Sequence, residues 1–147
     1  MTHDSANLPL DLTFGVDPDS SGALRRALGA AINAHHASTV PHSTERFVLH
    51  VHDQEGDLAA GLSASLAWGW LFIEALFVAD AYRGRGIGRA LMIRAEDQAR
   101  AKGCHAAWLD TFQARDFYAA LGYESFATLQ DYPPGQSRHF MRKRLVP

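Results

Sequence analysis

The feature that most constrains this chain is a glycine-rich segment at residues 83–88 (RGRGIG), which joins two contrasting patterns. Residues 71–78 (LFIEALFV) before it form an apolar run that is short enough for a strand buried on both faces. After it, apolar residues recur at helical spacing, at Ile87, Leu91, Ala95 and Ala99. The sequence therefore predicts a strand, a tight loop and a helix whose first backbone N–H groups are free.

Free N–H groups at the start of a helix make a natural site for an anion. Glycines let the backbone approach a phosphate closely, and Arg83, Arg85 and Arg89 add charged, forked donors that suit a diphosphate. The loop therefore predicts a ligand that carries a pyrophosphate. An ordinary tight turn with solvated arginines is the alternative interpretation, and it stays open at this point.

Two other phosphate-binding motifs do not fit this segment. A P-loop needs Gly-Lys followed by Ser or Thr, and the absence of that triplet disfavours hydrolysis of nucleoside triphosphates. A dinucleotide-binding fold would place its third glycine at position 89, where this chain has Arg89.

Strand and helix patterns alternate along the rest of the chain without a linker or an internal repeat. The expected strands are residues 8–16, 47–53, 58–68, 105–112, 123–129 and 139–145, and the expected helices, besides the one after the loop, are residues 21–37 and 114–121. On the central helix, Glu96 and Asp97 are expected on the polar side. This order argues for an α/β fold in which helices flank a mixed sheet.

Length and composition fit one domain, because 147 residues with 47% hydrophobic residues can build a single core. We expect residues 1–147 to form this domain, with residues 1–7 flexible. The formal net charge of −2 gives no basic excess for nucleic acid or an anionic membrane, and no secretory leader is recognisable, so we expect a cytoplasmic protein. Cys104 is the only cysteine, which excludes an internal disulfide, and we expect it to be a small buried residue.

Two motifs resemble those of the GNAT superfamily of N-acetyltransferases. The loop matches the pattern Arg or Gln, two residues, Gly, one residue, then Gly or Ala through Arg83, Gly86 and Gly88. Residues 117–123 (FYAALGY) look like the second motif of the superfamily, an aromatic-Tyr pair followed by Gly and an aromatic residue. The resemblance extends over residues 46–145 and is strongest to a bacterial subgroup of small members.

This resemblance implies a GNAT-like α/β fold, with a mostly antiparallel central sheet, splayed middle strands and about four flanking helices. It also implies acetyl-coenzyme A as co-substrate, with the pantetheine arm paired to the strand edge in the gap, and no metal. The residues that the resemblance and the loop chemistry assign to this ligand are Leu76, Phe77, Val78, Arg83, Gly84, Arg85, Gly86, Ile87, Gly88, Arg89 and Phe117. The chain departs from many members at Thr111, where they carry Asn, and in the short connection of residues 112–117.

Acetyl transfer to an amine needs a base for the amine, a donor for the oxyanion and an acid for the leaving thiolate. Tyr118 matches the superfamily tyrosine that faces the cofactor sulfur, so the resemblance implies it as the general acid, with packing of the FY pair as the alternative. Glu74 is the candidate base, through water, because a carboxylate in an apolar strand should have a raised pKa. A structural hydrogen bond or salt bridge is an equally good role for Glu74. The oxyanion donor is expected to be a backbone N–H near Val78.

Further polar and aromatic residues lie close to these segments. Trp68 and Trp70 either wall an acceptor pocket or belong to the core. Asp110 and Tyr132 are placed near the acceptor, without a catalytic role.

Two groups of charged or titratable residues are expected to be structural. His50 and His52 share one face of a strand but have no third ligand at a recognisable spacing, so they predict a structural pair rather than a metal site. The basic C-terminal residues are expected to form a solvated strand face; they are Arg138, Arg142, Lys143 and Arg144.

The chain is compact and has no additional module for docking a macromolecule, so we expect a primary amine of a small molecule as the acceptor. Acetylation of a protein lysine or N-terminus is the alternative within enzymes. A non-catalytic, coenzyme A-binding regulatory protein is the alternative outside them. A homodimer is compatible with the resemblance.

Overall fold

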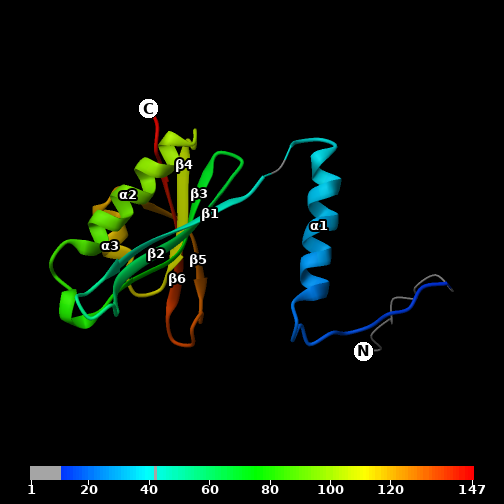
Figure 1. Cartoon of the computed structure of the whole chain (residues 1–147), viewed down its shortest axis with the longest axis horizontal. Coiled ribbons are helices and arrows are strands. Elements are labelled where there is room, and N and C mark those ends of the chain that lie inside the picture. Colours follow the sequence, from blue (N-terminus) through cyan, green and yellow to red (C-terminus); the bar gives the residue numbers. More distant parts are fainter. Residues whose placement is uncertain (1–10, 42) are drawn as a thin grey trace. The chain divides into compact units, whose positions relative to one another are not determined.

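A computed structural model describes residues 11–41 and 43–147 of the chain (Figure 1). The elements in order are α1 (Ala23–Ala37), β1 (Glu45–His52), β2 (Leu58–Ala67), β3 (Trp70–Val78), the 3-10 helix η1 (Asp80–Tyr82), α2 (Ile87–Ala101), β4 (Ala106–Thr111), α3 (Arg115–Ala120), β5 (Glu124–Gln130) and β6 (Ser137–Arg144). The described residues therefore hold three α-helices and one short 3-10 helix, where the resemblance led us to expect about four helices. Among these helices, none is long and apolar enough to cross a membrane.

The chain divides into two units at the boundary between residues 42 and 43. The first unit contains α1, which follows the left-handed Gly22, and Arg25 in the first turn of α1 pairs with Asp19 at 2.8 Å. The strand expected at residues 8–16 is wrong for residues 11–16, which pair with no other segment, because an alternating pattern becomes a strand only when a partner completes its hydrogen bonds. Residues 8–10, and the expected flexible residues 1–7, lie outside the described part.

The second unit is a six-stranded mixed sheet in the order β1-β2-β3-β4-β6-β5. Every neighbouring pair is antiparallel except β3 and β4, which are parallel and are joined by the crossover through η1, the glycine-rich loop and α2. The helix α2 packs against β2 and β3, and Figure 1 shows α2 and α3 on the same side of the sheet. The predicted mostly antiparallel sheet with flanking helices is confirmed.

The two middle strands separate along their length. β3 and β4 are paired only from Trp70 opposite Ala106 to Phe72 opposite Trp108, although β3 continues to Val78 and β4 to Thr111. Beyond these pairs, the backbone groups on the facing edges have no ladder partner, which leaves a wedge-shaped opening in the sheet. The splayed arrangement that the resemblance implies is confirmed.

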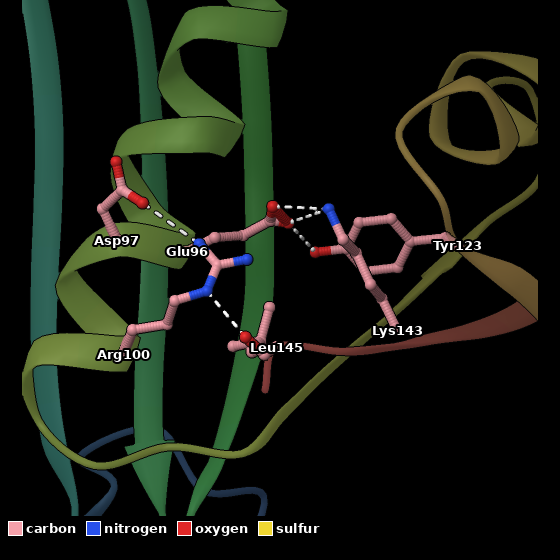
Figure 2. Close-up of polar contacts among 6 residues, drawn as sticks. All are labelled: Glu96, Asp97, Arg100, Tyr123, Lys143 and Leu145. Carbon is pink, nitrogen blue, oxygen red and sulfur yellow. Dashed lines mark hydrogen bonds and ion pairs between the residues drawn. The ribbon is translucent and has the colours of Figure 1, made fainter. Parts of the chain in front are cut away.

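The core between α2 and the sheet contains a charged residue. Glu96 is 3% exposed, so its expected position on the polar side of α2 is wrong. Its carboxylate accepts hydrogen bonds from Lys143 Nζ of β6 at 2.7 and 3.0 Å and from the Tyr123 hydroxyl at 3.1 Å (Figure 2). Periodicity on one helix cannot reveal such a partner, because Lys143 and Tyr123 reach Glu96 from other elements.

Figure 2 also shows how the end of α2 is attached to the end of the sheet. Arg100 donates from Nε to the Leu145 carbonyl at 2.7 Å and from Nη1 to Asp97 at 3.0 Å. Nearby, Cys104 is buried, as expected. The helix that begins at the glycine-rich loop is therefore anchored at its far end by side-chain bonds to β6 and the residue that follows it.

Candidate active site

The glycine-rich loop follows β3 and η1 and leads into α2. Gly84 and Gly86 have φ angles of 74° and 79°, in the left-handed region that strongly favours glycine. Gly86 is the N-cap of α2, and no side chain caps the helix, so its first N–H groups lack a side-chain acceptor. Together with the helix dipole, these groups make the start of α2 a favourable place for an anion.

The loop lines a cleft of about 560 Å³. Its lining residues are Leu76, Phe77, Val78, Tyr82, Arg83, Gly84, Gly86, Ile87, Gly88, Arg89, Gln113, Ala114, Phe117 and Tyr118. A Cβ atom added at Gly84 or Gly86 would meet no protein atom within 4 Å, whereas one at Gly88 would lie 3.4 Å from the Phe117 ring. The open space beside Gly84 and Gly86 is therefore available to a ligand that needs close contact with the backbone.

The three arginines of the loop have different surroundings. Arg83 donates from Nε to the Val78 carbonyl at 3.0 Å and pairs through Nη1 with Asp80 at 3.0 Å, so it also ties the loop to the end of β3. Arg89 lines the cleft. Arg85 does not line it, and its guanidinium lies 5.7 Å from the centre of the Tyr82 ring. Of all the residues expected to bind the cofactor, Arg85 is the one that the cleft does not include.

Tyr118 on α3 lies at the inner end of the cleft and is 8% exposed. Its ring contacts Phe117 and Tyr123 edge to face, with centroid distances of 5.0 and 6.1 Å. Burial, and then the negative charge of Asp110, raise the pKa of the Tyr118 hydroxyl. The hydroxyl therefore keeps its proton across the neutral range, as a proton donor must.

A second pocket of about 260 Å³ occupies the opening between the splayed strands. It is lined by Ile73, Glu74, Ala75, Leu76, Leu109, Asp110, Thr111, Phe112, Gln113, Ala114, Tyr118 and Arg138. Four residues, Leu76, Gln113, Ala114 and Tyr118, line both this pocket and the cleft. Two ligands can therefore approach Tyr118 from two sides, which is the arrangement required for group transfer between them.

Residues 17–123 match the acetyltransferase (GNAT) family. The chain belongs to this family. It is 38% identical over 104 residues to the blasticidin-S acetyltransferase of Streptomyces morookaense, a match that covers 69% of this chain and 76% of that protein. The structure of an acetyltransferase from Bacillus cereus superposes with a TM-score of 0.76 at 28% identity, over 89% of this chain and 97% of that one.

The fold is also shared with an aminoglycoside 6′-N-acetyltransferase complexed with coenzyme A, with a TM-score of 0.62 at 18% identity over 81% of each chain. At that identity the likeness concerns the fold alone. The predicted membership of the superfamily is thus confirmed, and the GNAT match begins nearer the N-terminus than the resemblance in the sequence did.

In this GNAT enzyme, Glu74 is not buried as the sequence led us to expect. Ile73 pairs with Ala64 and Ala75 pairs with Ser63, which leaves Glu74 as the extra residue of a β-bulge in β3. The side chain is exposed and lines the second pocket, and no described residue bonds to its carboxylate. The outer half of β3 is paired with β2 on one edge only, because β4 separates from the other edge after Phe72, so this half is more open than a strand buried on both faces.

Arg138 is a site residue that the sequence pattern did not reveal. It was expected on a solvated strand face, but its side chain is only 21% exposed and lines the second pocket. Its Nη1 donates to Asp110 Oδ1 at 2.7 Å, and its guanidinium lies 4.1 Å from the centre of the Tyr132 ring. The last strand contains several arginines and lysines, so the sequence does not distinguish Arg138 from the others. Only the pairing of β4 with β6 brings Asp110 beside it.

The remaining candidates lie outside both pockets or have local roles. Trp68 and Trp70 line neither the cleft nor the second pocket. Within the described ranges, no group of three or more metal-ligating side chains exists, and the exposed pair His50 and His52 approaches to 3.2 Å between the two Nδ1 atoms. Thr111 accepts a hydrogen bond from the Ala114 N–H at 3.1 Å and so shapes the turn into α3.

Proposed function

We propose that this GNAT enzyme transfers the acetyl group of acetyl-coenzyme A to a primary amine of a small molecule by direct attack. The observation that carries the proposal is the meeting of the cleft and the second pocket at Tyr118. The cleft holds the coenzyme, and the second pocket, which is less than half as large, holds the acceptor. Acetylation of a small molecule by the related blasticidin-S acetyltransferase supports the same class of acceptor here.

The backbone of β3 and the loop hold the coenzyme. One edge of β3 is used by β2, through pairs that include Gly61 opposite Phe77 and Leu62 opposite Leu76. The other edge has no ladder partner beyond Phe72, so the amides of the pantetheine arm can pair with it as an added strand would. The N–H groups at the start of α2, with Arg89 beside them, receive the pyrophosphate.

In the reaction, the amine nitrogen attacks the acetyl carbonyl carbon, and the bond from that carbon to sulfur breaks. Tyr118 donates its hydroxyl proton to the departing thiolate, and its raised pKa means that this proton is present at neutral pH. A backbone N–H near Val78 stabilises the oxyanion. Glu74 takes, through water, the proton that the amine nitrogen loses as the amide forms, since its carboxylate is open to solvent and lines the acceptor pocket.

Isothermal titration with acetyl-coenzyme A, followed by thiol release from the same samples across a panel of amines, tests this function. We expect saturable binding and amine-dependent release of free thiol. Binding without release from any small amine would favour a protein acceptor or a regulatory role. Absence of binding would overturn the proposal.

A further inference from the structure

Arg138 has a hydrogen-bond donor that the folded chain leaves unused. Its Nη1 is bonded to Asp110 Oδ1, but its Nε is buried and has no partner among the described residues. An N–H group that loses water without gaining an acceptor costs free energy, and arginine presents Nε and the neighbouring Nη as a fork. A planar pair of oxygens, as in a carboxylate, is the partner that suits such a fork.

The guanidinium of Arg138 is held in place from several elements. The Tyr132 ring, in the connection between β5 and β6, lies 4.1 Å from it, and the Phe112 ring, just after β4, lies at 5.4 Å. The Asp110 carboxylate fixes one edge of the group. These contacts limit the rotation of the side chain, so a ligand that binds its remaining edge has little side-chain entropy to overcome.

The position of Arg138 relates this donor to the proposed reaction. Arg138 and Asp110 line the second pocket from β6 and β4, and Glu74 lines it from β3. Tyr118 lines both this pocket and the cleft. An acceptor in this pocket therefore meets the Glu74 carboxylate and the Tyr118 hydroxyl, which take part in the proposed reaction. It also meets the Arg138 guanidinium on β6. Asp110 already balances the charge of Arg138, so the fork can take a charged or a neutral oxygen acceptor.

We propose that Arg138 selects the acceptor, and that the acceptor is a small primary amine that also carries a carboxylate or carboxamide group, bound through its oxygen to the free edge of Arg138. This inference rests on the proposed function, because it concerns the acceptor of that reaction. In this proposal Arg138 binds the carboxylate or carboxamide of the acceptor. Asp110 does not contact that group and acts by positioning Arg138.

The chain offers a matched control on the same strand. Arg142 lies four residues after Arg138 in β6, pairs with Glu124 at 3.3 Å and lies over the Phe126 ring at 5.2 Å. Its side chain is 53% exposed, and it does not line the second pocket. Arg142, like Arg138, therefore has an acidic partner and an aromatic ring beside it, but it lies outside the second pocket.

The test compares three matched series of amines of increasing chain length in the thiol-release assay: ω-amino acids, their carboxamides, and the plain alkylamines. We expect kcat/KM to be higher by about 10- to 100-fold for the best oxygen-bearing amine than for its alkylamine, the effect of one hydrogen bond to a charged group. The better of the first two series identifies the group as a carboxylate or a carboxamide.

Variants at the two arginines then locate the selection. We expect Arg138→Gln to remove the preference by raising KM for the oxygen-bearing amines far more than for the alkylamines, and Arg142→Gln, outside the pocket, to leave the preference as it is in the parent. Arg138→Lys, which keeps the charge beside Asp110 but lacks the fork, should lose the preference as well and serves if the glutamine variant does not fold.

Thiol release in which the alkylamines match or exceed the oxygen-bearing amines would overturn this inference and leave the acetyltransferase function standing. An equal loss for all amines in both Arg138 variants would also overturn it, because that pattern indicates a structural role. Absence of release from every amine would instead count against the proposed function itself, and the inference would fall with it.

Discussion

The cleft and the second pocket meet at Tyr118, yet they are made from the chain in different ways. Most of the cleft comes from one continuous segment, residues 76–89, and its chemistry is that of backbone groups and glycines. The second pocket takes side chains from β3, β4, α3 and β6. A site made of backbone tolerates many side-chain changes but no added bulk at its glycines. A site made of side chains can change its ligand without affecting the other half.

The sharpest test of the junction is Tyr118→Phe, which removes the hydroxyl but keeps the ring. Loss of a general acid typically slows a reaction by about 10²- to 10⁴-fold, so we expect kcat to fall within that range. Coenzyme affinity should remain, because the coenzyme is proposed to bind through backbone groups of the cleft. Titration with acetyl-coenzyme A and steady-state kinetics measure both quantities. An unchanged kcat would remove Tyr118 from the chemistry and leave it a packing residue.

Lys143→Met tests the buried contact between Lys143 and Glu96, which connects α2 to β6. Glu96 lies on α2, which begins at the cleft, and bonds to Tyr123, whose ring packs against Tyr118. Removing Lys143 leaves the Glu96 carboxylate buried without its cation, and we expect a loss of about 3–5 kcal/mol in the free energy of unfolding. Chemical denaturation measures it.

The control for that variant is Lys102→Met, because Lys102 pairs with Glu45 at 3.2 Å where both side chains are more than half exposed. An exposed pair contributes about 0–1 kcal/mol, so this variant should unfold almost as the parent does. Equal losses in the two variants would show that burial adds nothing to the Glu96 pair.

Gly86→Ala tests the statement that the cleft depends on its backbone. Gly86 and Gly56 both have positive φ, and a Cβ at either would meet no protein atom within 4 Å, but only Gly86 lines the cleft. Each alanine should cost about 1–2 kcal/mol of stability from the left-handed conformation. We expect Gly86→Ala alone to weaken coenzyme binding, by about tenfold or roughly 1.4 kcal/mol, and calorimetric titration to measure the difference.

Gly88→Asp should weaken binding further than Gly86→Ala. It brings a Cβ to 3.4 Å from the Phe117 ring and places a negative charge at the start of α2, where the phosphates are expected. If neither variant changes coenzyme affinity, the loop does not bind the pyrophosphate.

The smallest expected effect is the pH dependence of stability. Burial raises the pKa of Tyr118 and Tyr123 in the folded protein, with Asp110 and Glu96 adding to the shifts. The unfolded chain therefore loses these protons first, near pH 10, and the free energy of unfolding falls as pH rises from there towards the folded pKa values. Below pH 10 this contribution is fully present. Chemical denaturation from pH 9 to 11 should show a shallower fall for Tyr123→Phe than for the parent.

The parts of the protein that the sequence predicted well are local. Residues 83–88 carry the glycines and the helix start of the cleft, and residues 117–123 place Tyr118 on a short helix before a strand. The strands expected at residues 47–53 and 58–68 correspond to β1 and β2, which pair with each other antiparallel. In each case neighbours in the chain supply the hydrogen bonds or the spacing, so a short stretch of sequence contains the information.

The errors concern residues whose environment is made by distant elements. Glu74 was expected to be buried, but a bulge opposite Ser63 and Ala64 exposes it. Glu96 was expected to be solvated, but Lys143 and Tyr123 bury it. Burial of a charge depends on whether a partner reaches it, and the sequence pattern of one element does not contain that partner.

By itself the sequence determined the glycine-rich loop at the start of a helix, the order of the elements from residue 45 onwards and the family, because these depend on backbone conformation and on spacing along the chain. The tertiary structure decided where the second pocket lies and which charges line it. β4 leaves β3 after Phe72 and pairs with β6, and this pairing brings Asp110 and Arg138 together across the opening that Glu74 lines. Side chains from strands far apart in the sequence become a site only when the sheet has formed, because the ladder hydrogen bonds set their register.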